Sequence, residues 1–162
     1  MLSEMKSKKI YCDVSKCLGC KSCEIACAVE HSKSKTLFQA INETPLPEKR
    51  VSVEYLDLPS SIFFATGEST RHLPSSLPLR CRHCEEALCI SACMSGAMYK
   101  APDGSTQHNE EKCVGCWMCI MVCPFGAISR KEKLALKCDL CKDRDKGPAC
   151  VDACPTKSLI IK

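Results

Sequence analysis

Four cysteines spaced by two, two and three residues, and closed by a proline, lie between Cys113 and Pro124. Such a run is typical of a loop that holds a [4Fe–4S] cluster, because two-residue spacings let three thiolates wrap one face of an iron–sulfur cubane. The turning backbone can direct its N–H groups at the cluster sulfurs. The fourth cysteine starts a short helix and points away, toward a second cluster. The run therefore predicts paired clusters and a partner run elsewhere in the chain.

Three further runs bring the number of grouped cysteines to sixteen. Run one is Cys17, Cys20, Cys23 and Cys27; run two is Cys81, Cys84, Cys89 and Cys93; run three is Cys113, Cys116, Cys119 and Cys123; run four is Cys138, Cys141, Cys150 and Cys154. The middle gap is four residues in run two and eight in run four, and only runs three and four end in Cys-Pro. At four thiolates per cluster, the chain is predicted to hold four [4Fe–4S] clusters.

The ligands of each cluster follow from the rule that the fourth cysteine of a run serves the neighbouring cluster. The predicted ligand sets are set 1, Cys17, Cys20, Cys23 and Cys154; set 2, Cys138, Cys141, Cys150 and Cys27; set 3, Cys81, Cys84, Cys89 and Cys123; and set 4, Cys113, Cys116, Cys119 and Cys93. One cysteine is left over. Cys12 is expected to pack as a small apolar side chain on its strand, with a role as an alternative ligand or intermolecular thiol as the second interpretation.

Other uses of so many cysteines fit the spacing less well. Two Cys-x-x-Cys pairs can build a zinc site, but zinc sites separate the pairs by a spacer, and these runs supply a third thiolate too early. Structural disulfides are not expected, because the charged segment 1–9 lacks the apolar run of a signal peptide. No Cys-x3-Cys-x2-Cys loop of a radical S-adenosylmethionine enzyme is present, and no glycine-rich dinucleotide fingerprint, so flavin or nicotinamide would be bound elsewhere.

Composition and charge narrow the function classes further. Aromatic residues make up only 5% of the 162 residues, so the clusters themselves are expected to form the core. The net charge of +4 would favour nucleic acid, but four clusters of charge about −2 each turn it to roughly −4. Nucleic-acid binding is therefore not expected. No apolar stretch approaches the roughly 18 residues that span a bilayer, and a reducing cytoplasm is the expected location.

The elements between the runs predict an α+β fold. Short strands are expected at 8–13 and 158–162, and these two strands would pair. A helix is expected at 22–31. Hairpins are expected at 97–108, with an Asp-Gly turn, and at 127–137, with a charged tip at 130–133. If the terminal strands pair, two bacterial 2[4Fe–4S] ferredoxin-like modules are nested, with short helices, short antiparallel β-hairpins and a β-rich connector. The predicted units are an outer module of residues 1–31 and 137–162, a connector hairpin of residues 32–78, and an inserted module of residues 79–136. The connector is expected to contain strands at 51–55 and 61–65 and a Ser/Pro-rich exit at 73–78.

Three features inside the runs invite a second interpretation. Trp117, between two ligands, is expected to pack over a cluster, with docking to a partner as the alternative. His83 could ligate iron, but its run is already complete, so a role in the loop is preferred. The charged residues 142–149 predict an exposed loop, either a solvated face or a docking patch.

The four runs, with the long gap in the fourth, resemble the four-cluster iron–sulfur subunits that serve molybdopterin oxidoreductases, formate dehydrogenases and hydrogenases. Within that family, residues 20–31, 81–85 with 95–98, and 116–128 look most like the electron-transfer subunit of anaerobic nickel carbon monoxide dehydrogenase. The resemblance implies a relay of single electrons from carbon monoxide dehydrogenase to a hydrogenase or a flavin-dependent NAD(P) reductase, with no substrate site on this chain.

Two alternatives stay open beside it. The same relay could serve a formate dehydrogenase or a hydrogenase, and a protein of another class, a zinc-stabilised interaction module, would use the cysteines only for structure. The chain is shorter than the larger subunits of the family and lacks their C-terminal transmembrane extension. We therefore expect no direct membrane insertion, and contact with a membrane complex only through partners.

Overall fold

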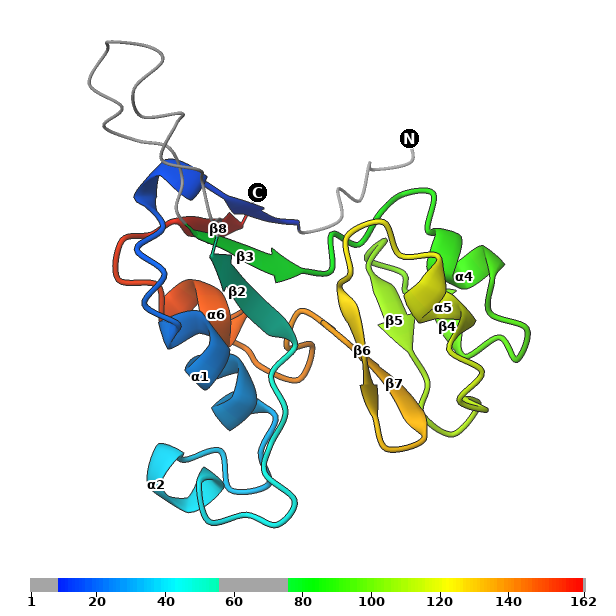
Figure 1. The fold of residues 1–162 in the computed structure, drawn as a ribbon, viewed down its shortest axis with the longest axis horizontal. Coiled ribbons are helices and arrows are strands. Elements are labelled where there is room, and N and C mark those ends of the chain that lie inside the picture. Colours follow the sequence, from blue (N-terminus) through cyan, green and yellow to red (C-terminus); the bar gives the residue numbers. More distant parts are fainter. Residues whose placement is uncertain (1–8, 56–75, 162) are drawn as a thin grey trace, which may run out of the picture.

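The computed structural model describes residues 9–55 and 76–161. In this part of the chain, four two-stranded antiparallel sheets and several short helices form two groups. Figure 1 shows one group built from β1, β2, β3, β8, α1, α2 and α6, and beside it a second built from β4 to β7 with α4 and α5. The chain passes between the groups at the end of β3 and again after β7.

The two ends of the described chain meet in one sheet. Strand β1 (Ile10–Cys12) pairs antiparallel with β8 (Leu159–Ile161), with Cys12 opposite Leu159. The predicted pairing of the terminal strands is therefore confirmed. A 3-10 turn at Val14–Lys16 leads from β1 toward run one.

The helix predicted at 22–31 is also found: α1 (Ser22–Glu30) packs against α6 (Ala149–Asp152) of run four. Segments more than a hundred residues apart thereby lie side by side. Because α1 carries Cys23 and Cys27 and α6 carries Cys150, the contact brings cysteines of the first and fourth runs together.

The connector differs from its predicted form. Strand β2 (Val51–Tyr55) lies where expected, but it pairs with β3 (Ser76–Arg80), so the Ser/Pro-rich exit supplies a strand. Pro78 is tolerated there because each strand of a two-stranded sheet has a free edge that needs no N–H donor. The predicted strand at 61–65 lies outside the described residues. The connector also forms a helical turn, α2 (Leu37–Ala40), that was not predicted.

The second group consists of two hairpins and two short helices. Strands β4 (Met98–Lys100) and β5 (Thr106–His108) form the predicted Asp-Gly hairpin, and β6 (Ile128–Lys131) and β7 (Leu134–Lys137) form the other. The charged tip of the second hairpin is shorter than predicted, because Arg130 and Lys131 belong to β6. Helices α4 (Leu88–Ser91) and α5 (Met118–Met121), from runs two and three, pack against each other.

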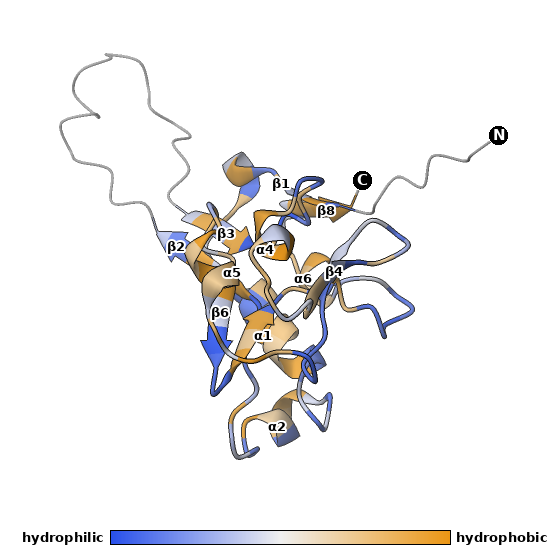
Figure 2. Cartoon of the chain, turned by 90° about the vertical axis from the view of Figure 1, so that its right-hand side faces the viewer, coloured by the Kyte–Doolittle hydropathy of each residue, from blue (hydrophilic) through white to orange (hydrophobic). Residues whose placement is uncertain are grey.

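Cysteines form much of both hydrophobic cores. The first core is centred on Ile10, Cys23, Cys27, Val51, Val53, Cys150 and Leu159, and the second on Met98, Cys119, Ile128 and Ala135 with four half-buried cysteines around them. Figure 2 colours much of α1, α5 and α6 as hydrophobic, although Ile25 of α1 and Met121 of α5 are exposed. In neither group do aliphatic side chains alone make the interior. Among the described residues, no helix is long and apolar enough to cross a membrane.

Candidate metal centres

The cysteines of set 1 line one small cavity. Cys17, Cys20 and Cys23 reach it from the loop before α1 and from the first turn of that helix, and Cys154 reaches it from the end of α6. Val53 of β2 and Leu159 of β8 complete its apolar wall. Three cysteines of run one and the last cysteine of run four thus face a common space.

Set 4 has the same arrangement in the second group. Cys113, Cys116 and Cys119 line a cavity together with Cys93 from the end of α4. Met98, Ala135 and Trp117 form the rest of its wall. Trp117 has a left-handed backbone at φ +65°, and the Arg130 guanidinium lies 4.8 Å from the centre of its ring. The indole therefore borders the set-4 cavity, which is its predicted packing role.

The cysteines of set 2 interact in the interior beside α1. Burial raises the pKa of Cys27 to about 12, and the neighbouring Cys138 and Cys141 raise it too. Burial raises the pKa of Cys138 to about 11, and that of Cys150 rises through burial and through Cys138, Cys27 and Cys141. Thiols as buried as these bind metal as thiolates, since a coordinating cation removes the penalty for the charge.

Three cysteines of set 3 interact directly. Burial raises the pKa of Cys89, as do Cys81 and Cys123 nearby. Cys84 follows Cys81 by three residues in the same loop, and its carbonyl accepts a hydrogen bond from Lys100 Nζ. Cys81 also interacts with Cys138 of set 2. Sets 2 and 3 are therefore neighbours across the boundary between the two groups.

Donors surround the sulfur atoms. Backbone N–H groups of Arg50, His83, Met98 and Leu140 point at the Sγ atoms of Cys27, Cys81, Cys93 and Cys138, at N···S distances of 3.2 to 3.5 Å. Ser76 Oγ lies 3.3 Å from Cys17 Sγ. Hydrogen bonds of this kind stabilise the negative charge on cluster ligands.

A hydroxyl two residues after a ligand is a repeated feature that the sequence reasoning missed. Ser22, Ser95 and Thr156 lie 3.4, 3.7 and 3.8 Å from the sulfurs of Cys20, Cys93 and Cys154. The hydrogen bond with Ser22 lowers the pKa of Cys20. The spacing Cys-x-Ser/Thr was the available signal: it occurs four times, and the hydroxyl approaches the sulfur at three of these positions.

The donor set fits [4Fe–4S] clusters. Thiols from two runs converge in each group, N–H donors face several of their sulfurs, and the side chains between sets 2 and 3 carry buried polar atoms without a protein partner. Among the described residues these atoms include Arg80 Nε and His83 Nε2, both N–H groups that suit a sulfur acceptor.

Comparison with known proteins agrees with this chemistry. Residues 75–162 match the family described as a 4Fe-4S dicluster domain, and residues 14–30 match a 4Fe-4S binding domain. The chain belongs to the 4Fe-4S dicluster family. It binds more than one [4Fe–4S] cluster, and the prediction of this cofactor is confirmed.

Relatives of this dicluster protein extend the match over most of its length. It is 38% identical to an "Iron-sulfur protein" of Rhodospirillum rubrum, over 93% of this chain and 79% of the relative. It is 34% identical to the "Electron transport protein HydN" of Escherichia coli, over 93% and 85%, and 31% identical to the "Thiosulfate reductase electron transfer subunit PhsB" of Salmonella typhi, over 91% and 71%.

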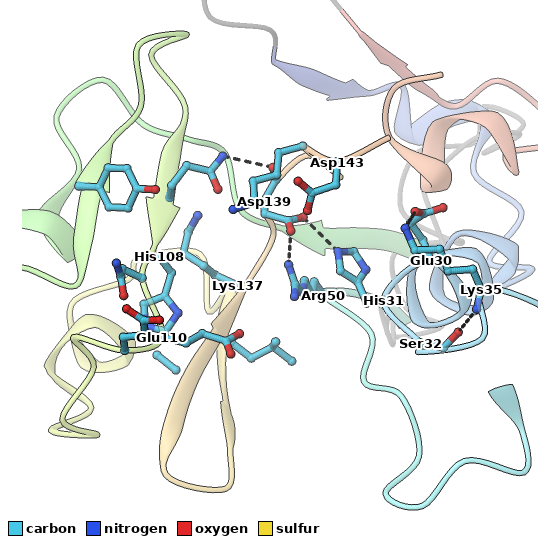
Figure 3. A pocket seen from close by; sticks show the side chains of 17 residues that line it. Glu30, His31, Ser32, Lys35, Arg50, His108, Glu110, Lys137, Asp139 and Asp143 are labelled. Carbon is cyan, nitrogen blue, oxygen red and sulfur yellow. Dashed lines mark hydrogen bonds and ion pairs between the residues drawn. The ribbon is translucent and has the colours of Figure 1, made fainter. Parts of the chain in front are cut away.

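A polar cavity lies between the two groups of the dicluster protein (Figure 3). At its wall, Asp139 accepts from His31 Nε2 at 3.1 Å and forms an ion pair with Arg50 at 2.5 Å. Burial by itself would raise the pKa of Asp139, but the hydrogen bond from His31 and the charge of Arg50 hold it below its ordinary value. His31 Nδ1 donates to the carbonyl of Cys27 at 2.7 Å. The network therefore links the backbone at Cys27 to Asp139, the residue that follows Cys138.

Cys12 and His83, the other two residues that the sequence analysis discussed individually, lie beside the cysteine sets. Cys12 packs half-buried against the first core, 3.5 Å from Ser158 Oγ, as predicted. His83 lies in the loop of run two, where its side chain is 1% exposed and its Nδ1 accepts from the N–H of Thr106 at 3.1 Å. Burial, with Lys137 and Arg80 nearby, lowers the pKa of His83 to about 3.

The loop of run four is exposed at most of its charged residues, as predicted. Arg144 is the exception, because its guanidinium forms ion pairs with Asp152 of α6 at 2.7 Å and with Glu30 of α1 at 3.3 Å. These contacts fix the loop to the two helices that carry sets 1 and 2.

Proposed function

We propose that this protein transfers single electrons through four [4Fe–4S] clusters between a catalytic redox subunit and a downstream acceptor. The observation that carries the proposal is the convergence of cysteines from paired runs, at α1 with α6 and at α4 with α5. The names of two relatives, an electron transport protein and an electron transfer subunit, support it.

Four clusters are proposed with the crossed ligand assignment. Sets 1 and 4 are supported by the cavities that their cysteines line, and sets 2 and 3 by the interactions among theirs. The pairing of β1 with β8 supports the nested arrangement, in which residues 79–136 form a module inserted into one made of residues 1–31 and 137–162, with residues 32–78 as the connector.

When bound, each cluster accepts and releases one electron. The protein's contribution is to hold the sets in a row. Helix α1 carries ligands of sets 1 and 2, and Cys138 of set 2 interacts with Cys81 of set 3. The packing of α4 against α5 joins sets 3 and 4. The two cysteines with exposed surfaces, Cys20 and Cys116, belong to the outer sets 1 and 4. We propose these sets as the points where electrons enter and leave. Buried cysteines such as Cys27 and Cys150 keep the inner sets from water.

The proposed partner is carbon monoxide dehydrogenase, on the strength of the resemblance at residues 20–31, 81–85 with 95–98, and 116–128. A formate dehydrogenase or hydrogenase catalytic subunit fits the relatives about equally. In each case the chain has no substrate site of its own, and a hydrogenase or a flavin-dependent NAD(P) reductase takes the electrons.

The partner is tested by anaerobic mixing. The purified, oxidised protein is mixed in turn with carbon monoxide dehydrogenase and CO, formate dehydrogenase and formate, and hydrogenase and H2, and the broad visible absorption is followed. Fast bleaching with carbon monoxide dehydrogenase alone supports that partner, and fast bleaching with one of the others selects the alternative. A protein that dithionite bleaches but no enzyme reduces would overturn the relay.

A further inference from the structure

Two basic side chains are buried where the two groups meet. Arg80, at the end of β3, is 8% exposed, and Lys137, at the end of β7, is 3% exposed. Among the described residues, they are the only buried lysine or arginine. Both lie on the short segments that carry the chain from one group to the other, directly before Cys81 and Cys138.

Neither cation has a carboxylate partner in the part of the chain that the structure describes. Arg80 donates to the carbonyls of Ile10 and Cys81, and Lys137 Nζ donates to those of Thr106 and, at 2.7 Å, Cys138. Basic side chains elsewhere, such as Lys49 and Arg144, form ion pairs with acidic ones. A buried cation that contacts only carbonyls needs another source of negative charge, because an unpaired buried charge costs several kcal/mol.

Cysteines of the inner sets lie within electrostatic reach of these two residues. Arg80 interacts with Cys138 and Cys150 of set 2 and with Cys81 of set 3, and also with the leftover Cys12. Lys137 interacts with Cys138 of set 2 and with Cys89 of set 3. For the outer sets, the largest charge interactions at Cys23 come from Glu24, Cys17 and Cys20, and those at Cys119 come from Cys113, Cys93 and Cys89.

Unpartnered donors point to the same place. Arg80 Nε is buried and has no hydrogen-bond partner among the described residues, and the same holds for His83 Nε2. His83 Nδ1 accepts from the Thr106 N–H, so the neutral ring carries its proton on Nε2 and that atom is a donor. The junction therefore presents two cations and two free N–H groups to sets 2 and 3.

We propose that Arg80 and Lys137 supply the positive charge that makes the two inner clusters, held by sets 2 and 3, easier to reduce than the two outer ones. This inference rests on the proposed function and its ligand assignment. Each reduction adds one electron and one negative charge to a cluster and moves no proton, so a fixed buried cation favours the reduced state. Electrons taken from the partner then rest at the junction between the groups before they leave.

The test is an anaerobic redox titration of the full chain with four clusters, followed by electron paramagnetic resonance. Lys137→Met and Arg80→Gln remove one charge each, and Lys142→Met removes one from an exposed position as the matched control. We expect the equilibrium constant for reduction of two clusters to fall at least about tenfold in the first two variants, which is about 59 mV for one electron. Lys137→Arg should retain the wild-type values, and Lys142→Met should change nothing.

The unmodified protein supplies a second measurement, and variants at the exposed outer ligands assign its signals. The first two electrons should enter a pair of mutually interacting clusters, and Cys20→Ser and Cys116→Ser, which alter the outer clusters, should leave the signals of that pair unchanged. First reduction at an outer cluster, or a loaded Lys137→Met variant with wild-type potentials, overturns the inference while the relay stands. Fewer than about 16 irons in the unmodified protein would instead refute the proposed four clusters.

Discussion

Replacing Gly115 with alanine should open the set-4 site. Two other glycines with a left-handed backbone serve as matched controls. Gly115 lies between the ligands Cys113 and Cys116 with φ +68°. A Cβ added there would lie well inside 3.0 Å of the Lys133 carbonyl oxygen in the β6–β7 turn, closer than real Cβ atoms come. Gly96 has the same φ of +68° and Gly126 one of +56°, but a Cβ at either position would meet nothing within 4 Å.

The free-energy cost of the Gly115→Ala substitution has two parts. A left-handed alanine costs roughly 1–2 kcal/mol at all three positions. The contact with Lys133 adds roughly 1–3 kcal/mol at Gly115 only, since a backbone oxygen in a tight turn cannot rotate away. A difference of about 1.4 kcal/mol is a factor of ten in an equilibrium. The fraction of Gly115→Ala chains with set 4 closed should therefore fall roughly fivefold to a hundredfold below that of Gly96→Ala.

The assay is the iron content and visible absorption of anaerobically reconstituted variants, with the rate of bleaching under a chelator. Gly115→Ala should retain about 12 irons, or lose the fourth cluster fastest, while Gly96→Ala and Gly126→Ala keep about 16. Equal iron loss in Gly115→Ala and Gly96→Ala would refute the reasoning from the Lys133 contact. Full iron content in Gly115→Ala would refute that reasoning as well.

Three further predictions address the sets and the network around them. Cys154→Ser should disturb the cluster of the first run rather than that of the fourth, as seen by electron paramagnetic resonance, and the reverse would mean serial modules. Asp139→Asn should weaken the contacts with His31 and Arg50 by about 1–3 kcal/mol and speed bleaching of the set-2 cluster, whereas unchanged bleaching would show that the network is dispensable. Stripping the clusters should abolish the cooperative fold in circular dichroism, because cysteines form much of both cores, and a folded apo-chain would contradict this.

The elements of this fold follow from short-range signals that the sequence carries openly. Helix α1 follows from the absence of proline after Cys27, and the β4–β5 hairpin from Asp103-Gly104. The β2 partner could not be read, because a stretch such as Ser76–Arg80 contains a proline and alternates polar residues with leucines whose buried side was not apparent. There the polar positions Ser76 and Arg80 are the buried ones, which reverses the usual pattern.

The proposed ligands rest on a related kind of signal. Cysteine spacing is a local property, and the crossed sets need only the rule that a fourth ligand points outward. The surroundings of the ligands depend on contacts far apart in the chain. Asp139 meets His31 across more than a hundred residues, and His83 is buried only because the β4–β5 hairpin covers it. No spacing in the sequence announces either contact.

The most direct test of four clusters acting as one relay is a count of iron, sulfide and electrons on the same anaerobic sample. The proposal predicts about 16 irons and 16 sulfides per chain, and about four electrons taken up in a reductive titration. Zinc in place of iron, or about eight irons with two electrons, would contradict it.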